Sequence, residues 1–164
     1  MSMQDKLKKC LKEGEKGKRH KGLRKIEKSE ERAKQHLEKA IHNFKAMISF
    51  QKTGFSDWSA SASFYCLYHC LLSLLAKQGY ESRNQSCTFA LIENMIHEYS
   101  ITLENLKEIF DKDVTEDLEH SSKILDIREN MQYSVKTALE GEEFIELKLR
   151  TKELFDKLRK DIEK

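Results

Sequence analysis

Apolar residues recur every three or four positions over most of the chain, a spacing that predicts amphipathic helices. Between residues 29 and 52, apolar residues that follow this spacing are Ala33, Leu37, Ala40, Ile41, Phe44 and Ile48. Ser29 is a suitable N-cap, because a serine hydroxyl accepts a hydrogen bond from an unpaired backbone N–H of the first turn. Gly54 is placed to end the helix. The first main helix is therefore predicted from Ser29 to about Lys52.

The most apolar segment lies between Ser56 and Gly79. Ser56 or Asp57 is expected to cap a helix that continues to about Lys77, and Gly79 is expected to end it. Small residues fill its first turns, and large apolar residues surround its second half. A helix that is apolar on several sides packs on several sides, so this helix is predicted to be the central one.

The second half of the chain predicts two short helices and two long ones. The short helices span about 88–96 and the residues after a Thr102 cap.

A long helix is expected to begin at Asp113 or Thr115, and Gly141 is expected to end it. Its apolar stripe is Leu118, Ile124, Ile127, Met131, Val135 and Ala138, and that of the last helix is Phe144, Leu147, Thr151, Leu154, Phe155, Leu158 and Ile162. No segment alternates with a period of two, so no sheet is expected. The predicted fold is all-α, an up-and-down antiparallel four-helix bundle with short extra helices.

Charge divides the chain into a basic extension, residues 1–28, and a bundle, residues 29–164. The extension has a net charge of +7 and the remainder −5. A short helix at about 4–13 is followed by a glycine-containing basic segment that is typical of a linker. Its cations could contact phosphate groups through counterion release, and these are Lys18, Arg19, Lys21, Arg24 and Lys25. The alternative is a flexible, solvated extension that contributes little to the core and is dispensable for folding.

Four cysteines occur, and none belongs to a C-x-x-C pair. Cys66 and Cys70 lie four residues apart on an apolar helix, where small buried side chains are the simpler interpretation than half of a metal site. Neither a metal nor a cofactor is expected. Free thiols and the lack of a signal peptide favour the cytoplasm. The run from Phe64 to Ala76 is too short and too polar to predict a membrane span.

Arg128 is the most informative polar residue, because it lies beside the apolar stripe of a predicted helix. An unpaired charge away from water is costly, so Arg128 is expected either to bind a phosphate or to form an internal ion pair. Asn130 and Tyr133 follow it as candidate ligand contacts. His69, within the central helix, and His120, two turns before Arg128, are the candidate catalytic groups, although a lone His on an apolar helix is more often a hydrogen-bonded core residue.

Three short motifs resemble one family. Ala62-Ser63-Phe64-Tyr65-Cys66-Leu67-Tyr68-His69-Cys70 resembles the aromatic–His helix of HEPN domains (higher eukaryote and prokaryote nucleotide-binding), approximately A-x-x-Y-Y-A-x-F-H-A in a small prokaryotic branch. The segment from Gly79 to Cys87 is similar to the Gly-x-x-x-Lys-x-His-Ser-Gly loop of that branch. The segment from Arg128 to Tyr133 is similar to its Arg-x-x-Ala-Asp-Tyr. Order and spacing agree from about Ser29 to Lys160.

The resemblance implies a four-helix bundle that forms a homodimer. Many HEPN domains are toxins or defence ribonucleases, and many are encoded beside a nucleotidyltransferase that acts as antitoxin. Active members carry a His a few residues after the Arg, as general acid or base. Here residues 133–135 are Tyr, Ser and Val, and Gln85-Ser86-Cys87 replaces the loop's His-Ser-Gly. Tyr cannot replace His as a base near neutral pH.

Three functions follow as hypotheses. The favoured one is a non-catalytic module that binds a nucleotide or RNA within a toxin–antitoxin or stress and defence system. The second is a metal-independent ribonuclease toxin that uses Arg128 with His120 or His69. The third is a helical interaction scaffold without a ligand, in which Arg128 only forms a structural ion pair.

Overall fold

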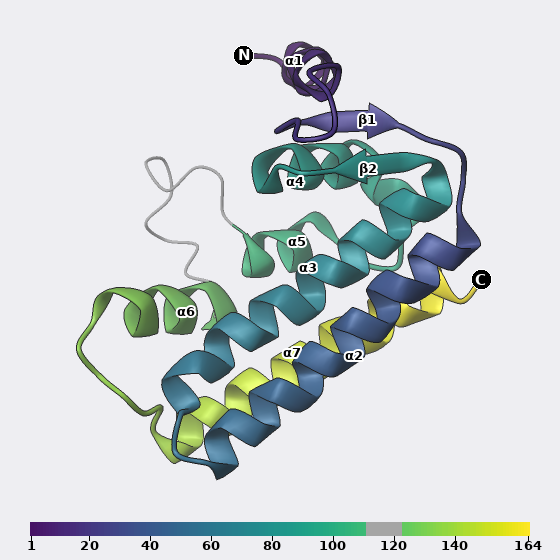
Figure 1. Ribbon diagram of the computed structural model, residues 1–164. Coiled ribbons are helices and arrows are strands. Elements are labelled where there is room, and N and C mark those ends of the chain that lie inside the picture. Colours follow the sequence, from purple (N-terminus) through teal and green to yellow (C-terminus); the bar gives the residue numbers. More distant parts are fainter. Residues whose placement is uncertain (111–122) are drawn as a thin grey trace.

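Helices packed around one central helix dominate the computed structural model, which describes residues 1–110 and 123–164 (Figure 1). In chain order the elements are α1 (Met3–Gly14), β1 (Leu23–Lys25), α2 (Glu30–Lys52), η1 (Ser56–Trp58), α3 (Ser59–Gln78), β2 (Tyr80–Ser82), α4 (Gln85–Asn94), η2 (Ile96–Glu98), α5 (Leu103–Ile109), α6 (Lys123–Tyr133) and α7 (Gly141–Ile162). The two η elements are short 3-10 helices.

The predicted bundle is confirmed: α2, α3, α6 and α7 are its main helices, and short helices connect α3 to α6. The Ser29 hydroxyl accepts from the Arg32 backbone N–H at 3.0 Å, as expected of an N-cap. Gly79 ends α3 with φ of +87°, a left-handed conformation that favours glycine. Thr102 and Asn105 form a reciprocal capping box at the start of α5.

The central helix is α3, as predicted. It contacts α2, α4, α5, α6 and α7, and most of its side chains are buried. Small hydroxyl residues allow its neighbours to approach and are themselves hydrogen-bonded: Ser59 donates to the Met47 carbonyl at 2.7 Å, Ser73 to the Ala33 carbonyl at 2.7 Å, and Ser63 pairs with Thr151 at 2.6 Å. The segment Ser56–Gln78 is long and apolar enough to cross a membrane by length and composition, and 78% of its most apolar window is buried inside the bundle.

The expectation of no sheet is wrong, because β1 pairs with β2 in an antiparallel ribbon that places Leu23 opposite Ser82. Each strand has three residues, so neither shows a period-two pattern in the sequence. The ribbon ties the N-terminal segment to the residues that follow α3. Figure 1 shows β1 and α1 stacked over β2 and α4.

The N-terminal segment is folded onto the bundle, so the expected flexible, solvated extension is wrong, while its dispensability for folding stays a prediction. Leu7, Cys10 and Leu23 belong to the buried core. Gly14 lies in close contact with β1: a Cβ atom there would stand 1.7 Å from the Leu23 carbonyl oxygen. A Cβ atom on Gly22 would stand 2.2 Å from the Cys10 carbonyl oxygen. These glycines permit close backbone packing rather than flexibility. The division of the chain at residue 28 stays a prediction.

The end of α6 differs from the prediction. The helix stops at Tyr133, Val135 is 98% exposed, and Ala138 lies in the connection to α7. Gly141 begins α7 rather than ending the helix before it, and Glu140 caps α7 together with Glu143. The predicted start of the long helix, at 113 or 115, and Leu118 lie outside the described residues.

Replacement of Leu23 by Ala is expected to destabilise the protein by about 2–5 kcal/mol, because it leaves a cavity in the core. Leu23 is 1% exposed although it lies in the basic N-terminal segment. Chemical denaturation measures the loss in the free energy of unfolding. Lys25→Ala, at an exposed position of the same strand, is the control and should change stability little. Equal stability of Leu23→Ala and wild type would show that the segment does not pack on the bundle in solution.

Candidate functional site

Arg128 lies where α6 crosses α3. The neighbouring residues Ile124, Ile127 and Met131 are buried and hold α6 against the bundle. The Arg128 guanidinium carbon stands 3.9 Å from the centre of the Phe64 ring, whose residue is 1% exposed. This is a close cation–π contact on a ring that belongs to the core. The rest of the Arg128 side chain remains partly exposed.

The charge of Arg128 has no ion-pair partner among the described residues, and its buried Nε has no hydrogen-bond partner there. Burial lowers the pKa of Arg128, and the negative potential of Glu129 and the nearby Tyr65 and Tyr133 partly oppose this. An arginine nevertheless stays protonated at neutral pH. Within the described part of the chain, the site therefore holds a partly desolvated positive charge whose Nε donor has no partner.

A row of aromatic rings fixes the ring beneath Arg128. Phe64 stacks on Tyr68 with centroids 5.7 Å apart and 13° between the planes. Tyr68 contacts Phe89 at 6.0 Å, and Phe89 stacks on Phe110 at 4.4 Å. The Tyr68 hydroxyl is 3.0 Å from the Thr88 hydroxyl, and burial raises the pKa of Tyr68. Helices α3, α4 and α5 therefore all contribute to the position of the Phe64 ring.

The other two predicted ligand residues do not share the position of Arg128. Asn130 is exposed and stands about 200° around the helix from Arg128. Tyr133 is 81% exposed at the end of α6, and it is close enough to act electrostatically on Arg128. The structure thus brings Tyr133 towards Arg128 and leaves Asn130 on another side of the helix.

The sequence did not single out Tyr65, an exposed aromatic residue at this site. Tyr65 is 44% exposed, and it acts electrostatically on Arg128. Its ring contacts the Phe64 ring edge-on, with centroids 5.2 Å apart. The aromatic motif from Ala62 to Cys70 contains Tyr65, and it was the signal that could have identified this residue.

His69 is half-buried and paired with His36, which the sequence left without a companion. Their Nδ1 atoms are 3.0 Å apart, and the rings are stacked with centroids 5.3 Å apart. Burial, with the charges of His36 and Lys39, lowers the pKa of His69 to about 4. Burial, with Arg32 and Lys39, also lowers the pKa of His36. Both rings are therefore neutral at pH 7. His120 lies outside the described residues.

The basic segment is less free than predicted. Arg24 donates to the Gly14 carbonyl from Nε at 3.1 Å and from Nη2 at 3.0 Å, and to the Gly17 carbonyl. Its side chain therefore closes the turn between α1 and β1. The remaining predicted phosphate contacts, Lys18, Arg19, Lys21 and Lys25, are exposed.

The cysteines divide into two pairs. Cys66 and Cys70 are free and buried in α3, as small apolar side chains would be, and burial raises the pKa of Cys70. Cys10 and Cys87 form a disulfide, so the expectation of four free thiols is wrong for these two. No cluster of three or more His, Cys, Asp or Glu side chains suited to a metal occurs within residues 1–110 and 123–164.

The fold is a helical bundle around a central aromatic helix, with an arginine of α6 over one of its aromatic rings. Comparison with family profiles matches residues 33–162 to the HEPN domain. The match covers most of the 164 residues, and the chain belongs to the HEPN domain family, which is linked to ribonuclease and nucleotide-related functions. No curated protein matches the chain.

The His36–His69 pair predicts acid sensitivity. A histidine that stays neutral in the folded state, with a pKa of about 4 against 6.5 when unfolded, binds more protons after unfolding. Its contribution to stability is therefore complete above pH 6.5 and is lost as the pH falls towards 4. Thermal melts from pH 7.5 to 4.5 should show a smaller drop in Tm for His69→Gln than for wild type. His42→Gln, at an exposed position of α2, should follow the wild-type curve. Identical pH profiles for all three proteins would exclude this role of the pair.

Proposed function

We propose that this HEPN domain binds a nucleotide or RNA without cleaving it, and that Arg128 contacts a phosphate group. The observation that carries the proposal is the Arg128 guanidinium on the Phe64 ring, partly exposed and without a carboxylate partner within the described part of the chain. An internal ion pair, the alternative expected from the sequence, has no support among these residues.

A phosphate would satisfy what the Arg128 site lacks. The planar guanidinium presents a rigid fork of donors that matches two phosphate oxygens. The guanidinium already lies on the Phe64 ring, so less side-chain entropy would be lost on binding than for an arginine without such a contact. Phosphate charge would also offset the burial that disfavours the charged arginine.

Two exposed aromatic residues that act electrostatically on Arg128 suit the bases of a nucleic acid. Tyr65 and Tyr133 are 44% and 81% exposed. Base stacking on aromatic side chains contributes about 1–3 kcal/mol per base and does not require a particular sequence. An arginine for phosphate and aromatic rings for bases together favour single-stranded RNA or a free nucleotide.

The properties of His69 argue against catalysis by this residue. A general acid or base works best when its pKa lies near the operating pH. The pKa of His69 is lowered to about 4, and its Nδ1 is shared with His36. A histidine at the expected position after Arg128 is also missing, since Tyr133, Ser134 and Val135 stand there.

We place this function in a toxin–antitoxin or stress and defence system, as the family resemblance implies. A nucleotidyltransferase antitoxin is the proposed partner and the cytoplasm the proposed location. We also propose a homodimer. Exposed Ile145 and Leu149 support an interface on α7, since they lie one turn apart and are 59% and 63% exposed.

Arg128→Ala should weaken binding of a short single-stranded RNA more than tenfold, a loss of at least about 1.4 kcal/mol. Arg128→Lys should recover only part of it, because an ammonium lacks the planar fork. Fluorescence anisotropy with a labelled oligonucleotide measures the affinity, and circular dichroism confirms that each variant is folded.

Arg159→Ala is the matched control for Arg128→Ala. Arg159 also lies over an aromatic ring, Phe155 at 5.9 Å, but it is paired with Glu163 at 2.8 Å. The Arg159→Ala variant should therefore bind RNA with the same affinity as wild type. Equal binding by wild type and Arg128→Ala would leave the ligand-free scaffold. Cleavage of the RNA by metal-free wild-type protein, lost in a histidine variant, would favour the ribonuclease instead.

The double variant Ile145→Lys and Leu149→Lys should convert a dimer into a monomer, because burial of two charges in an apolar interface is unfavourable. Light scattering at tens of micromolar measures the mass. Leu103→Lys, on α5 at a position that is 38% exposed, is the control and should stay dimeric. A monomeric wild type would exclude the homodimer.

A further inference from the structure

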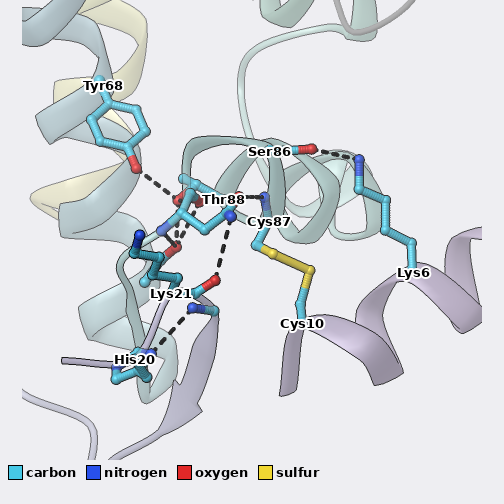
Figure 2. The surroundings of a disulfide bond; sticks show 11 residues. Lys6, Cys10, His20, Lys21, Tyr68, Ser86, Cys87 and Thr88 are labelled. Carbon is cyan, nitrogen blue, oxygen red and sulfur yellow. Dashed lines mark hydrogen bonds between the residues drawn. A yellow bond between two sulfur atoms is a disulfide. The ribbon is translucent and has the colours of Figure 1, made fainter. Parts of the chain in front are cut away.

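The disulfide between Cys10 and Cys87 joins two segments that are 77 residues apart in the sequence. Cys10 lies on α1, and Cys87 lies in the first turn of α4, where its backbone N–H donates to the Asn84 side chain at 2.9 Å. Figure 2 shows the bond between the two helices, with Lys6 reaching from α1 to Ser86 at 2.7 Å. Besides β1, α4 is the main element that α1 contacts.

The disulfide borders an open pocket, although both of its cysteines are buried core residues. The pocket has a volume of about 560 Å³, and both cysteines line it. Lys6, Lys9 and Lys21 line it as well, against a single carboxylate, Glu13. Glu13 is itself paired with Lys16 at 2.9 Å. Among the described residues the lining of the pocket is therefore positively charged, and the two cysteines form part of its wall.

The two sulfur atoms are not equivalent as leaving groups. Cys87 is the third residue of α4, where the partial positive charge of the helix N-terminus favours a thiolate. Cys10 lies in the last turns of α1, where this effect is absent. An attacking thiolate is therefore directed to the Cys10 sulfur, with Cys87 as the leaving thiolate, since the more stable thiolate leaves faster.

We propose that Cys10–Cys87 is a thiol–disulfide exchange site for small anionic thiols, and that its opening releases α1 from α4. The incoming thiolate forms a bond to Cys10 Sγ, the Cys10–Cys87 bond breaks, and its electron pair remains on Cys87 Sγ. A second thiolate attacks the sulfur of the bound thiol and leaves Cys10 as a thiolate. Two small thiols are thereby oxidised to one disulfide, the protein gains two electrons, and the two cysteine thiolates take up the two protons.

After the disulfide opens, only non-covalent contacts hold α1 against α4. α1 is 12 residues long, and its buried positions are Leu7, Cys10 and Gly14. An isolated helix of that length is marginal in water, so its order depends on docking. With the covalent link gone, α1 keeps the buried Leu7 and the Lys6–Ser86 hydrogen bond, and its C-terminal end stays in contact with β1. β1 stays paired with β2, so the change is confined to α1 and its surroundings.

The first experiment determines the state and accessibility of the bond in the full chain. Alkylation of the unfolded protein without reductant should label two of the four cysteines. Prior reduction with a dithiol should increase the number of labelled cysteines to four. Labelling of all four without reductant would overturn the proposal. The native protein is then treated with glutathione, which is anionic, or cysteamine, which is cationic, and mass spectrometry follows opening of the bond.

The expected result is that glutathione opens the bond at least fivefold faster than cysteamine, after correction for the rates of both thiols with a small-molecule disulfide. The double variant Lys9→Gln and Lys21→Gln should remove this preference. The control, Lys8→Gln with Lys12→Gln, removes the same charge from exposed positions of α1 that do not line the pocket, and should keep it. Equal rates for both thiols in wild type would overturn the assignment to anionic thiols.

Hydrogen exchange then tests the release of α1. Reduced wild type should exchange residues 3–14 at least tenfold faster than oxidised wild type, with α2 and α7 unchanged. Cys10→Ser should exchange fast with or without reductant. Unchanged exchange on reduction of wild type would overturn the release, and this measurement needs no variant to fold. None of these readouts depends on Arg128 or on a nucleic acid, so the proposal stands or falls separately from the proposed function.

Discussion

Burial of α3 on several sides is the constraint on which the rest of the structure depends. An apolar helix of this length must be covered, and α2, α6 and α7 cover it along its sides while α4 and α5 lie against its second half. Where the helices approach closely, the serine hydroxyl groups of α3 are removed from water and need hydrogen-bond partners on the neighbouring helices. Ser59, Ser63 and Ser73 find partners on α2 and α7, so the helices pack tightly without the cost of unsatisfied polar groups.

The same packing creates the candidate site. Phe64 is a core residue of α3, yet its ring also carries the guanidinium of Arg128. A cation–π contact of this kind contributes roughly 0.5–2 kcal/mol, which is less than the cost of leaving a buried donor without a partner. Among the described residues, the Nε of Arg128 is left without a hydrogen-bond partner, and this is the observation on which the proposed anion contact rests.

Helix α3 also connects the Arg128 site to the disulfide region. Tyr68 stacks on Phe64 on one side and lies within hydrogen-bond distance of Thr88 on the other, and Thr88 directly follows Cys87. Figure 2 shows Tyr68 directed from α3 towards the first turn of α4. Tyr68 of α3 therefore connects the ring beneath Arg128 to the turn of α4 that contains Cys87.

The sequence by itself determined the main helices, because their periodicity, caps and terminal glycines are local properties of consecutive residues. It also predicted the central place of α3, and it singled out Arg128 beside an apolar stripe, although the role of Arg128 stays a prediction. Tertiary structure alone decided what depends on residues far apart: the pairing of three-residue strands, the disulfide across 77 positions, the His36–His69 contact and the Phe64 ring beneath Arg128. The N-terminal glycines illustrate the reason, since Gly14 and Gly22 are typical of a linker in sequence but permit two backbones to touch in space.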